Sequence, residues 1–373
     1  MRVVSVIIAL FSLGSALARP AIARAQATPA PYAADGAFSL YSVHTSGVNA
    51  AGALDTRSGA DEISRTDLSN GLLTFAKNAG FFRFGITAGI YAFPTVGQAL
   101  NPTTQAGGNT ALYGYVPQAY IALVPNEHLT IAAGQLATLL GQENGFTYQN
   151  VTIQRGLVWA SEPAFSRGLR VTYTQGKFTG DLEYNDGYYT ARYRALEGLV
   201  GWAPSADTSV QFAFIVPQAD TPGNATTAIA NKIEYDVMLT QQLGKLELLP
   251  YVLLIASPAS ATLGYARAQS ATGAALLADY AFNGRFSIGA RYEWFADRSS
   301  STDASANADF LGYGPGSRAT SFTITPEYRA NPFFARAEFS SVNASGAKPG
   351  LAFGPAGTGV SQTRVIVETG VQF

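Results

Sequence analysis

The chain has 373 residues with 24 basic and 25 acidic side chains, and its net charge near −1 gives no reason to expect nucleic acid as a partner. It has no cysteine and only two histidines, His44 and His128, which excludes disulfides, thiolate chemistry and a His-rich metal site, so we expect no cofactor. Charged residues make up only 13% of the chain, against about a quarter in ordinary soluble domains, while Gly, Tyr and Phe number 38, 19 and 22. The fold has to account for this composition.

The first 27 residues have the pattern of an export signal. Arg2 is followed by the apolar run 3–13, which is too short to span a bilayer of about 30 Å. Small-x-small sites end at Ala18 and Ala27, and cleavage after Ala27 is preferred because the earlier site would leave an Arg-Pro pair directly after the cut. The expected mature chain starts with a short periplasmic segment, 28–36. No run of about 20 apolar residues follows, so no transmembrane helix is predicted.

From residue 37 to residue 373, long segments alternate between apolar and polar side chains with period two. The segment 285–296 places its aromatic and aliphatic side chains on one face, and Arg285, Arg291 and Glu293 on the other. Strands with lipid on one side and water on the other must alternate in this way for about 9 to 11 residues. The sequence therefore predicts an all-β fold, a transmembrane antiparallel up-and-down β-barrel.

Reading this alternation along the chain gives sixteen candidate strands, although fourteen or eighteen remain possible. An even number is what bacterial single-chain barrels have. The candidate strands span 37–46, 64–76, 81–93, 112–124, 129–139, 167–175, 178–188, 193–203, 208–217, 231–241, 246–256, 272–282, 285–296, 318–329, 333–342 and 362–373.

The connections between these strands alternate in length. Short links such as 77–80 and the hairpin pair Asn283-Gly284 are predicted to be periplasmic turns, and long polar stretches such as 94–111 and 343–361 to be outer loops. An unpaired backbone group in hydrocarbon costs several kcal/mol, so the sheet has to close on itself.

The final segment, 362–373, places alternate residues from Val365 to Phe373 on one face, with Arg364 and Glu368 on the other. A last strand that ends on Phe resembles the assembly signal of outer-membrane barrels. The resemblance implies that Phe373 is read by the barrel-assembly machinery.

The longest connection, 140–166, follows the fifth candidate strand. The stretch 134–170 contains GQLAT, GQE, RGL and a final Arg-Gly pair, and it resembles the β-barrel porin family described as OmpL-like. A lysine expected near Gln135 from that resemblance is missing, so no ion preference is inferred. The resemblance implies that this third outer loop folds into the lumen and narrows it.

On this resemblance, polar residues of the loop are the candidates for a pore constriction. An alternative is that Glu143 and Arg155 pair with each other or with the barrel wall and pin the loop without touching solute. The constriction candidates are Gln142, Glu143, Asn150, Gln154 and Arg155.

Strand periodicity also assigns charged side chains to the inner wall. One wall would carry a net charge of +2 and the roughly opposite wall −5, giving a transverse field that orients dipolar solutes. The alternative is that these charges are mutually paired scaffolding. The first set is Arg83, Arg285, Arg291, Glu293, Glu327, Arg329, Arg336, Glu338, Arg364 and Glu368, and the second is Asp181, Glu183, Glu197, Glu234 and Asp236.

The sequence thus predicts an outer-membrane porin, not an enzyme, for passive diffusion of small hydrophilic solutes. A barrel enzyme would need a rim histidine with a partner, and His44 lies close to Ser42 and Ser46. An adhesin or autotransporter is a third possibility, but about ten residues between signal and first strand leave no room for a passenger domain. Outer-membrane lipid would surround the barrel, and the small residues Ala88, Ala92 and Ala119 suggest a homotrimer interface.

Overall fold

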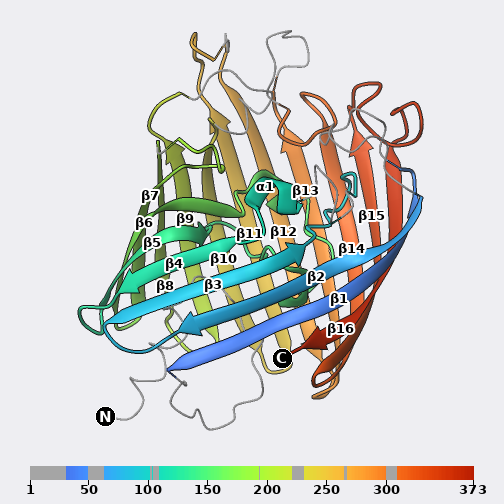
Figure 1. Ribbon diagram of the computed structural model, residues 1–373. Coiled ribbons are helices and arrows are strands. Elements are labelled where there is room, and N and C mark those ends of the chain that lie inside the picture. Colours follow the sequence, from blue (N-terminus) through green and yellow to red (C-terminus); the bar gives the residue numbers. More distant parts are fainter. Residues whose placement is uncertain are drawn as a thin grey trace.

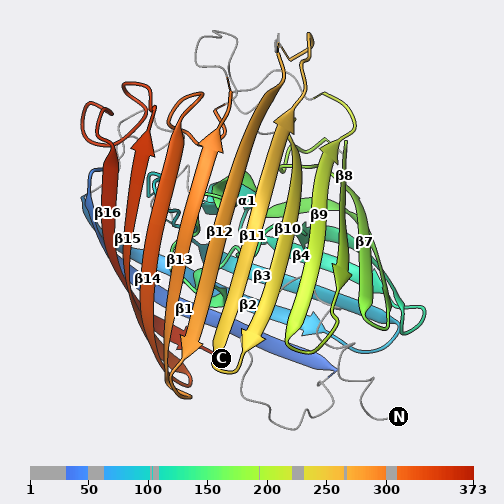
Figure 2. The same ribbon diagram turned by 180° about the vertical axis from the view of Figure 1, so that it is seen from behind.

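The computed structural model describes residues 31–48, 63–100, 103, 109–192, 194–220, 231–263, 267–299 and 309–373. In this part of the chain sixteen antiparallel strands form one closed barrel (Figures 1 and 2). Each strand pairs with its sequence neighbours, and β1 closes the ring by pairing with β16, Phe38 opposite Val371. The expected up-and-down barrel of sixteen strands is confirmed.

The strands are long enough to cross a bilayer at a tilt, with a few shorter ones in the first half of the chain. In the described part of the chain, three short helices lie in the connections: α1 (Asn109–Tyr113), η2 (Thr147–Gln149) and η3 (Trp159–Ser161). The strands are β1 (Tyr32–Ser46), β2 (Ser64–Lys77), β3 (Phe82–Tyr91), β4 (Gln118–Leu123), β5 (Leu129–Ala137), β6 (Phe165–Gln175), β7 (Phe178–Asn185), β8 (Ala195–Trp202), β9 (Thr208–Pro217), β10 (Ile233–Leu243), β11 (Leu246–Ser257), β12 (Gln269–Ala281), β13 (Phe286–Asp297), β14 (Arg318–Ala330), β15 (Phe333–Ser345) and β16 (Ser361–Gln372).

Most strand ends lie within three residues of the sequence-based expectation, and two differ by more. The first strand begins at Tyr32, which pairs with Lys77, so most of the segment expected at 28–36 belongs to the sheet. The strand expected at 112–124 shortens to β4 because Gly114 has a φ of +77° and Pro117 has no N–H to give to a ladder. The expected signal segment, 1–27, lies outside the described residues.

Burial alternates along the strands as the sequence predicted. On β15, Phe339 is 43% exposed on the outer face, while its neighbour Glu338 is 2% exposed on the inner face. The outer surface carries a belt of exposed aliphatic and aromatic side chains, among them Val365 and Val367 on β16. Among the described residues, no helix has the length and apolar character needed to cross a membrane.

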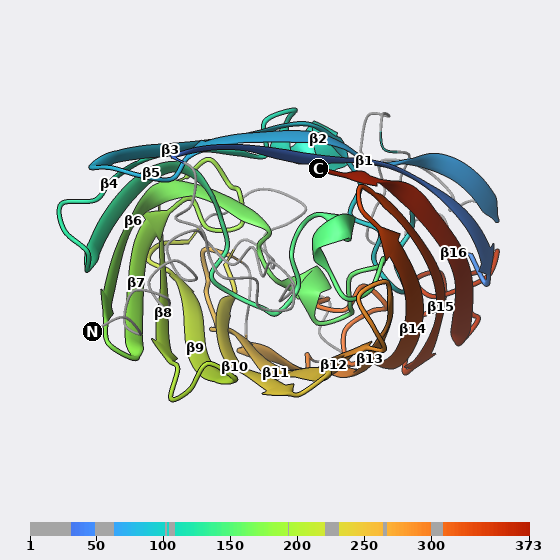
Figure 3. The same ribbon diagram turned by 90° about the horizontal axis from the view of Figure 1, so that it is seen from below.

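Residues 138–164, between β5 and β6, run inside the ring of strands, and we refer to them as the inserted loop (Figure 3). Its Leu157 and Val158 belong to a buried apolar cluster that also contains Leu253 of β11 and Leu277 of β12. The expected third loop in the lumen is confirmed, and part of the inner wall is apolar to receive it.

Candidate functional site

The first arm of the inserted loop is fastened to the wall through its own backbone. The N–H of Leu139 donates to Glu197 on β8, and the N–H of Gly141 donates to Asp236 on β10 at 2.8 Å. Gly141 has a φ of +79°, which glycine adopts without a steric penalty. Two wall carboxylates are thereby used as acceptors for the loop.

The tip of the loop binds two more carboxylates. Glu338 on β15 accepts hydrogen bonds from the backbone N–H groups of Ile153 and Gln154, the latter at 3.0 Å. It also accepts one from the side-chain amide of Gln154 at 2.9 Å. Glu368 on β16 accepts from the hydroxyl of Thr147 at 2.7 Å and pairs with Arg336. Charge-assisted bonds of this kind satisfy inward-facing backbone donors and hold the tip in place.

Arg291 on β13 joins the two arms of the loop to the wall. Its guanidinium contacts Glu143 at 2.7 Å and Glu293 at 3.1 Å, and donates to the backbone oxygen of Gln154 at 2.6 Å. Glu143 also accepts from the N–H of Gly156 at 3.0 Å. A buried ion pair compensates for its desolvation only with such additional hydrogen bonds, and here they are present.

The five residues predicted for the constriction are buried within the loop. Arg155 donates to backbone carbonyls of the loop itself, including that of Ile153 at 2.6 Å, and Glu143 binds the wall. These contacts agree with the alternative in which the two residues pin the loop. The exposed fractions of Gln142, Glu143, Asn150, Gln154 and Arg155 are 8, 5, 4, 0 and 0%.

Neutral side chains line the open space beside the loop. A cavity of about 470 Å³ is bounded on one side by Asn144 and Gln149 of the loop, and on the other by Gln118 of β4 and Phe165 of β6. Glu143, the one charged residue in this lining, is bound to Arg291. Of the five candidates, Glu143 belongs to this lining, whereas Asn144 and Gln149 were not predicted, because polarity alone does not tell which side a loop residue faces.

Most of the predicted lumen charges are on the inner face, but they are buried. Arg83, Asp181 and Arg329 are half-buried, and Arg285 is exposed in the turn before β13, outside the wall assigned to it, because the strand begins one residue later. The buried ones are Glu183, Glu197, Glu234, Asp236, Arg291, Glu293, Glu327, Arg336, Glu338, Arg364 and Glu368.

Two cations on the acidic wall were missed by the sequence analysis. Arg170 on β6 pairs with Glu183 at 2.5 Å, and Lys232 pairs with Glu234 at 2.8 Å. The periodicity of β6 puts Arg170 on the inner face and could have identified it. Lys232 directly precedes β10, so the alternation of residues along the strand does not assign a face to it.

Comparison with known proteins assigns the family. The sequence profile of the family described as "Putative beta-barrel porin-2, OmpL-like" matches residues 32–373. The chain belongs to this porin family. The porin is an outer-membrane channel protein. No curated protein sequence matches it.

Solved structures share the fold of the porin at low sequence identity. The outer-membrane channel DcaP of Acinetobacter baumannii has a TM-score of 0.61 at 11% identity, covering 92% of this chain and 97% of its own. The anion-selective porin from Comamonas acidovorans has a TM-score of 0.55 at 12% identity, covering 92% and 99%. Pseudomonas putida OprB has a TM-score of 0.56 at 11% identity, covering 92% and 94%.

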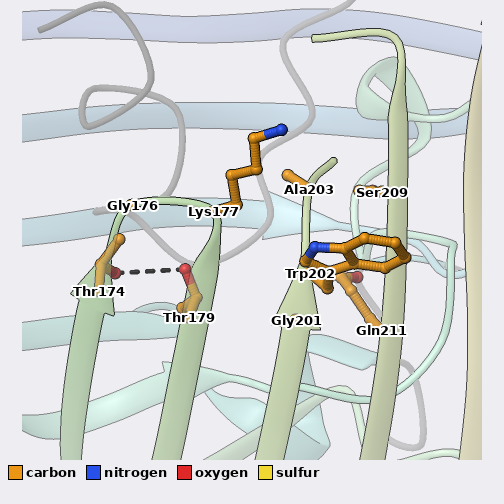
Figure 4. A pocket seen from close by; sticks show the side chains of 9 residues that line it. All are labelled: Thr174, Gly176, Lys177, Thr179, Gly201, Trp202, Ala203, Ser209 and Gln211. Atoms are coloured by element: carbon orange, nitrogen blue, oxygen red, sulfur yellow. Dashed lines mark hydrogen bonds between the residues drawn. The ribbon is translucent and has the colours of Figure 1, made fainter. Parts of the chain in front are cut away.

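A second concavity lies at the end of the porin with the short turns. It measures about 300 Å³ and is lined by Lys177, Trp202, Ala203, two glycines and polar side chains (Figure 4). The hydroxyls of Thr174 and Thr179 lie 3.3 Å apart there, with Ser209 and Gln211 beyond them. Polar and apolar groups therefore meet at this end of the barrel.

The two histidines of the porin have ordinary polar contacts. Nδ1 of His44 lies 2.8 Å from the hydroxyl of Ser64, a different serine from Ser42 and Ser46. His128 contacts the carbonyl of Thr174 in a turn. Within the described ranges, no group of His, Asp and Glu side chains could hold a metal ion.

Proposed function

We propose that this porin allows passive diffusion of small hydrophilic solutes and discriminates among them by size more than by charge. The observation that carries the proposal is that the neutral side chains of Gln118, Asn144 and Gln149 line the cavity beside the inserted loop, where the carboxylate of Glu143 is bound to Arg291. Most of the charges first expected to form a transverse field are buried, and several of them hold the loop, as Arg291, Glu338 and Glu368 do. Neutral amides replace part of a solute's hydration shell without selecting the sign of its charge.

Liposome swelling and planar-bilayer recording test this proposal. We expect swelling rates that fall steadily with the size of neutral solutes, and a small difference between cation and anion permeability. A barrel that gives neither swelling nor current, or one that passes a single sign of ion, would contradict it.

We further propose that the porin has no enzymatic activity. His44 is exposed and contacts the hydroxyl of Ser64, whereas Ser42 and Ser46 were the partners considered for a catalytic dyad. His44→Ala is expected to leave channel properties unchanged and to remove no hydrolysis of lipid or peptide substrates. Loss of a measurable hydrolytic activity in His44→Ala would overturn this.

We propose a homotrimer that associates through the outer faces of β3 to β5. Ala88 and Ala119 are small and half-buried there, whereas Ala92 is buried beyond the end of β3 and does not belong to this face. OmpT of Vibrio cholerae, with a TM-score of 0.55 and 11% identity, has been solved in a trimer form. Ala119→Trp is expected to convert a trimer into monomers on native gels, and an unchanged oligomer would exclude this face.

We propose that the chain is exported with cleavage after Ala27 and that Phe373 is recognised by the assembly machinery. The ring of Phe373 is exposed on the outer face, beside β1, and lipid would cover the apolar belt around it. Mass spectrometry of the purified protein tests the cleavage site. Phe373→Ala is expected to lower the yield of folded barrel in cells, and an unchanged yield would contradict the role.

A further inference from the structure

The second arm of the inserted loop carries a carboxylate into an acidic part of the wall. Glu162 lies between η3 and β6, and its carboxylate packs against the Cα of Gly141, where a side chain would otherwise begin. The N–H of the same glycine donates to Asp236 at 2.8 Å. Two carboxylates therefore flank one glycine in a buried place.

The carboxylates at this place differ in how far positive groups and hydrogen-bond donors compensate their negative charge. Glu234 pairs with Lys232 at 2.8 Å, and Asp236 accepts the N–H of Gly141. Neither carboxylate oxygen of Glu162 has a hydrogen-bond partner among the described residues, although the side chain is 92% buried (8% exposed). Lys232 also donates to the backbone oxygen of Ser161. Three carboxylates thus share one ammonium group, and Glu162 has the least compensation.

In the described part of the chain, the other groups around Glu162 supply no further positive charge to it. From β11, the hydroxyl of Tyr251 is buried there without a hydrogen-bond partner. The ring of Tyr188 lies against Lys232, 4.9 Å from the nitrogen. On the loop, Glu143 also faces this region, but Arg291 is bound to it.

An ionised carboxylate without a partner is strongly disfavoured in such a place, whereas its protonated form can donate a hydrogen bond to a neighbouring carboxylate. We propose that Glu162 is protonated while the inserted loop is docked, and that loss of this proton releases the second arm of the loop from β10. We call this contact of Glu162 the latch. The proposal of a latch rests on the proposed channel function, because its effect is a change in the lumen.

The direction of the pH effect follows from the shift. Burial, followed by the charges of Asp236 and Glu234, raises the pKa of Glu162 well above its ordinary value. A group with a raised pKa in the folded state stabilises that state fully at pH values below its ordinary pKa, and the stabilisation is lost as pH rises through the raised value. The loop is therefore docked in acid and loosens in alkali.

Planar-bilayer recording over a pH range from about 5 to about 9 tests the latch. We expect open-channel noise and conductance of the wild type to rise with pH, while Glu162→Gln keeps the acid behaviour throughout. Asp207→Asn removes a carboxylate in an exposed turn and serves as the matched control, with a wild-type profile expected. A pH-independent wild type, or a variant with the wild-type profile, would overturn the proposal.

An infrared measurement gives a readout that does not depend on conductance. Detergent-solubilised wild type at neutral pH should have the carbonyl stretch of protonated carboxylic acids, to which Asp236, Glu143 and Glu197 also contribute, and Glu162→Gln should lose part of its intensity. Absence of the band in the wild type, or equal intensity in the variant, rejects the protonated Glu162. If no current is obtained with either protein, the channel proposal fails, and the infrared result still decides the protonation state.

Discussion

The inserted loop contacts two inner walls that differ in how completely the buried carboxylates are paired with positive groups. On β13 to β16, arginines and loop donors compensate the buried carboxylates, as Arg291 does for Glu143 and Glu293. On β8 to β10, the wall carboxylates receive loop N–H groups, and Lys232 is shared with the loop carbonyl of Ser161. On the first wall, ion pairs and hydrogen bonds hold the loop, whereas at the second wall Glu162 of the loop has the least compensation for its charge. A charge that points into a barrel can therefore be structural, and its effect depends on its partner more than on its face.

The largest expected effect is the loss of the central cation on the compensated wall. Arg291→Met leaves Glu143 and Glu293 buried without their guanidinium, which should destabilise the docked loop by about 3–5 kcal/mol. Thermal unfolding in detergent should move to lower temperature, and channel noise should rise. Arg285→Met, at an exposed turn, is the control. Equal unfolding temperatures and equal channel noise of the two variants would contradict the role of Arg291 in holding the loop.

A smaller loss is expected at the tip. Glu338→Gln keeps the shape of the side chain but turns an amide NH2 toward backbone donors such as the N–H of Gln154. The expected cost is about 1.5–3 kcal/mol, because a charge-assisted acceptor is lost. Limited proteolysis should then cleave the loop faster than in the wild type, and an unchanged cleavage rate would contradict the role of Glu338.

Two glycine substitutions compare the walls directly. A Cβ at Gly156 meets the carboxylate of Glu293, which Arg291 holds, so Gly156→Ala should cost about 1–3 kcal/mol. A Cβ at Gly141 meets the carboxylate of Glu162, which has no partner to lose, so the main cost of Gly141→Ala is its left-handed backbone, about 1 kcal/mol. We expect the lower unfolding temperature for Gly156→Ala, and the reverse order would refute the difference in compensation.

The smallest effect is expected where the loop meets the cavity. Gln149→Glu and Gln149→Lys place opposite charges in the lining, where solvent reduces a charge interaction to about 1 kcal/mol. Reversal-potential measurements should shift toward cations for the first variant and toward anions for the second. Identical potentials for both would exclude Gln149 from the solute path.

Sequence reasoning was accurate where one physical rule governs many residues. The alternation over 285–296 and 333–342 predicted strands that the structure forms at Phe286–Asp297 and Phe333–Ser345. It was wrong over 112–117, where Gly114 and Pro117 interrupt a segment of suitable polarity. The inserted loop has no period, so its five constriction candidates were chosen by polarity and proved to be buried.

The alternation along the chain was enough to predict the closed barrel, because a strand with lipid on its outer face and polar groups on much of its inner face must alternate, and the sheet must leave no edge. The role of the inward charges became visible only in the folded chain. The loop that binds them arrives from a distant part of the chain, and the hydrogen-bond donors that meet Glu338 and Asp236 are backbone N–H groups, which every residue except proline possesses and no sequence pattern distinguishes.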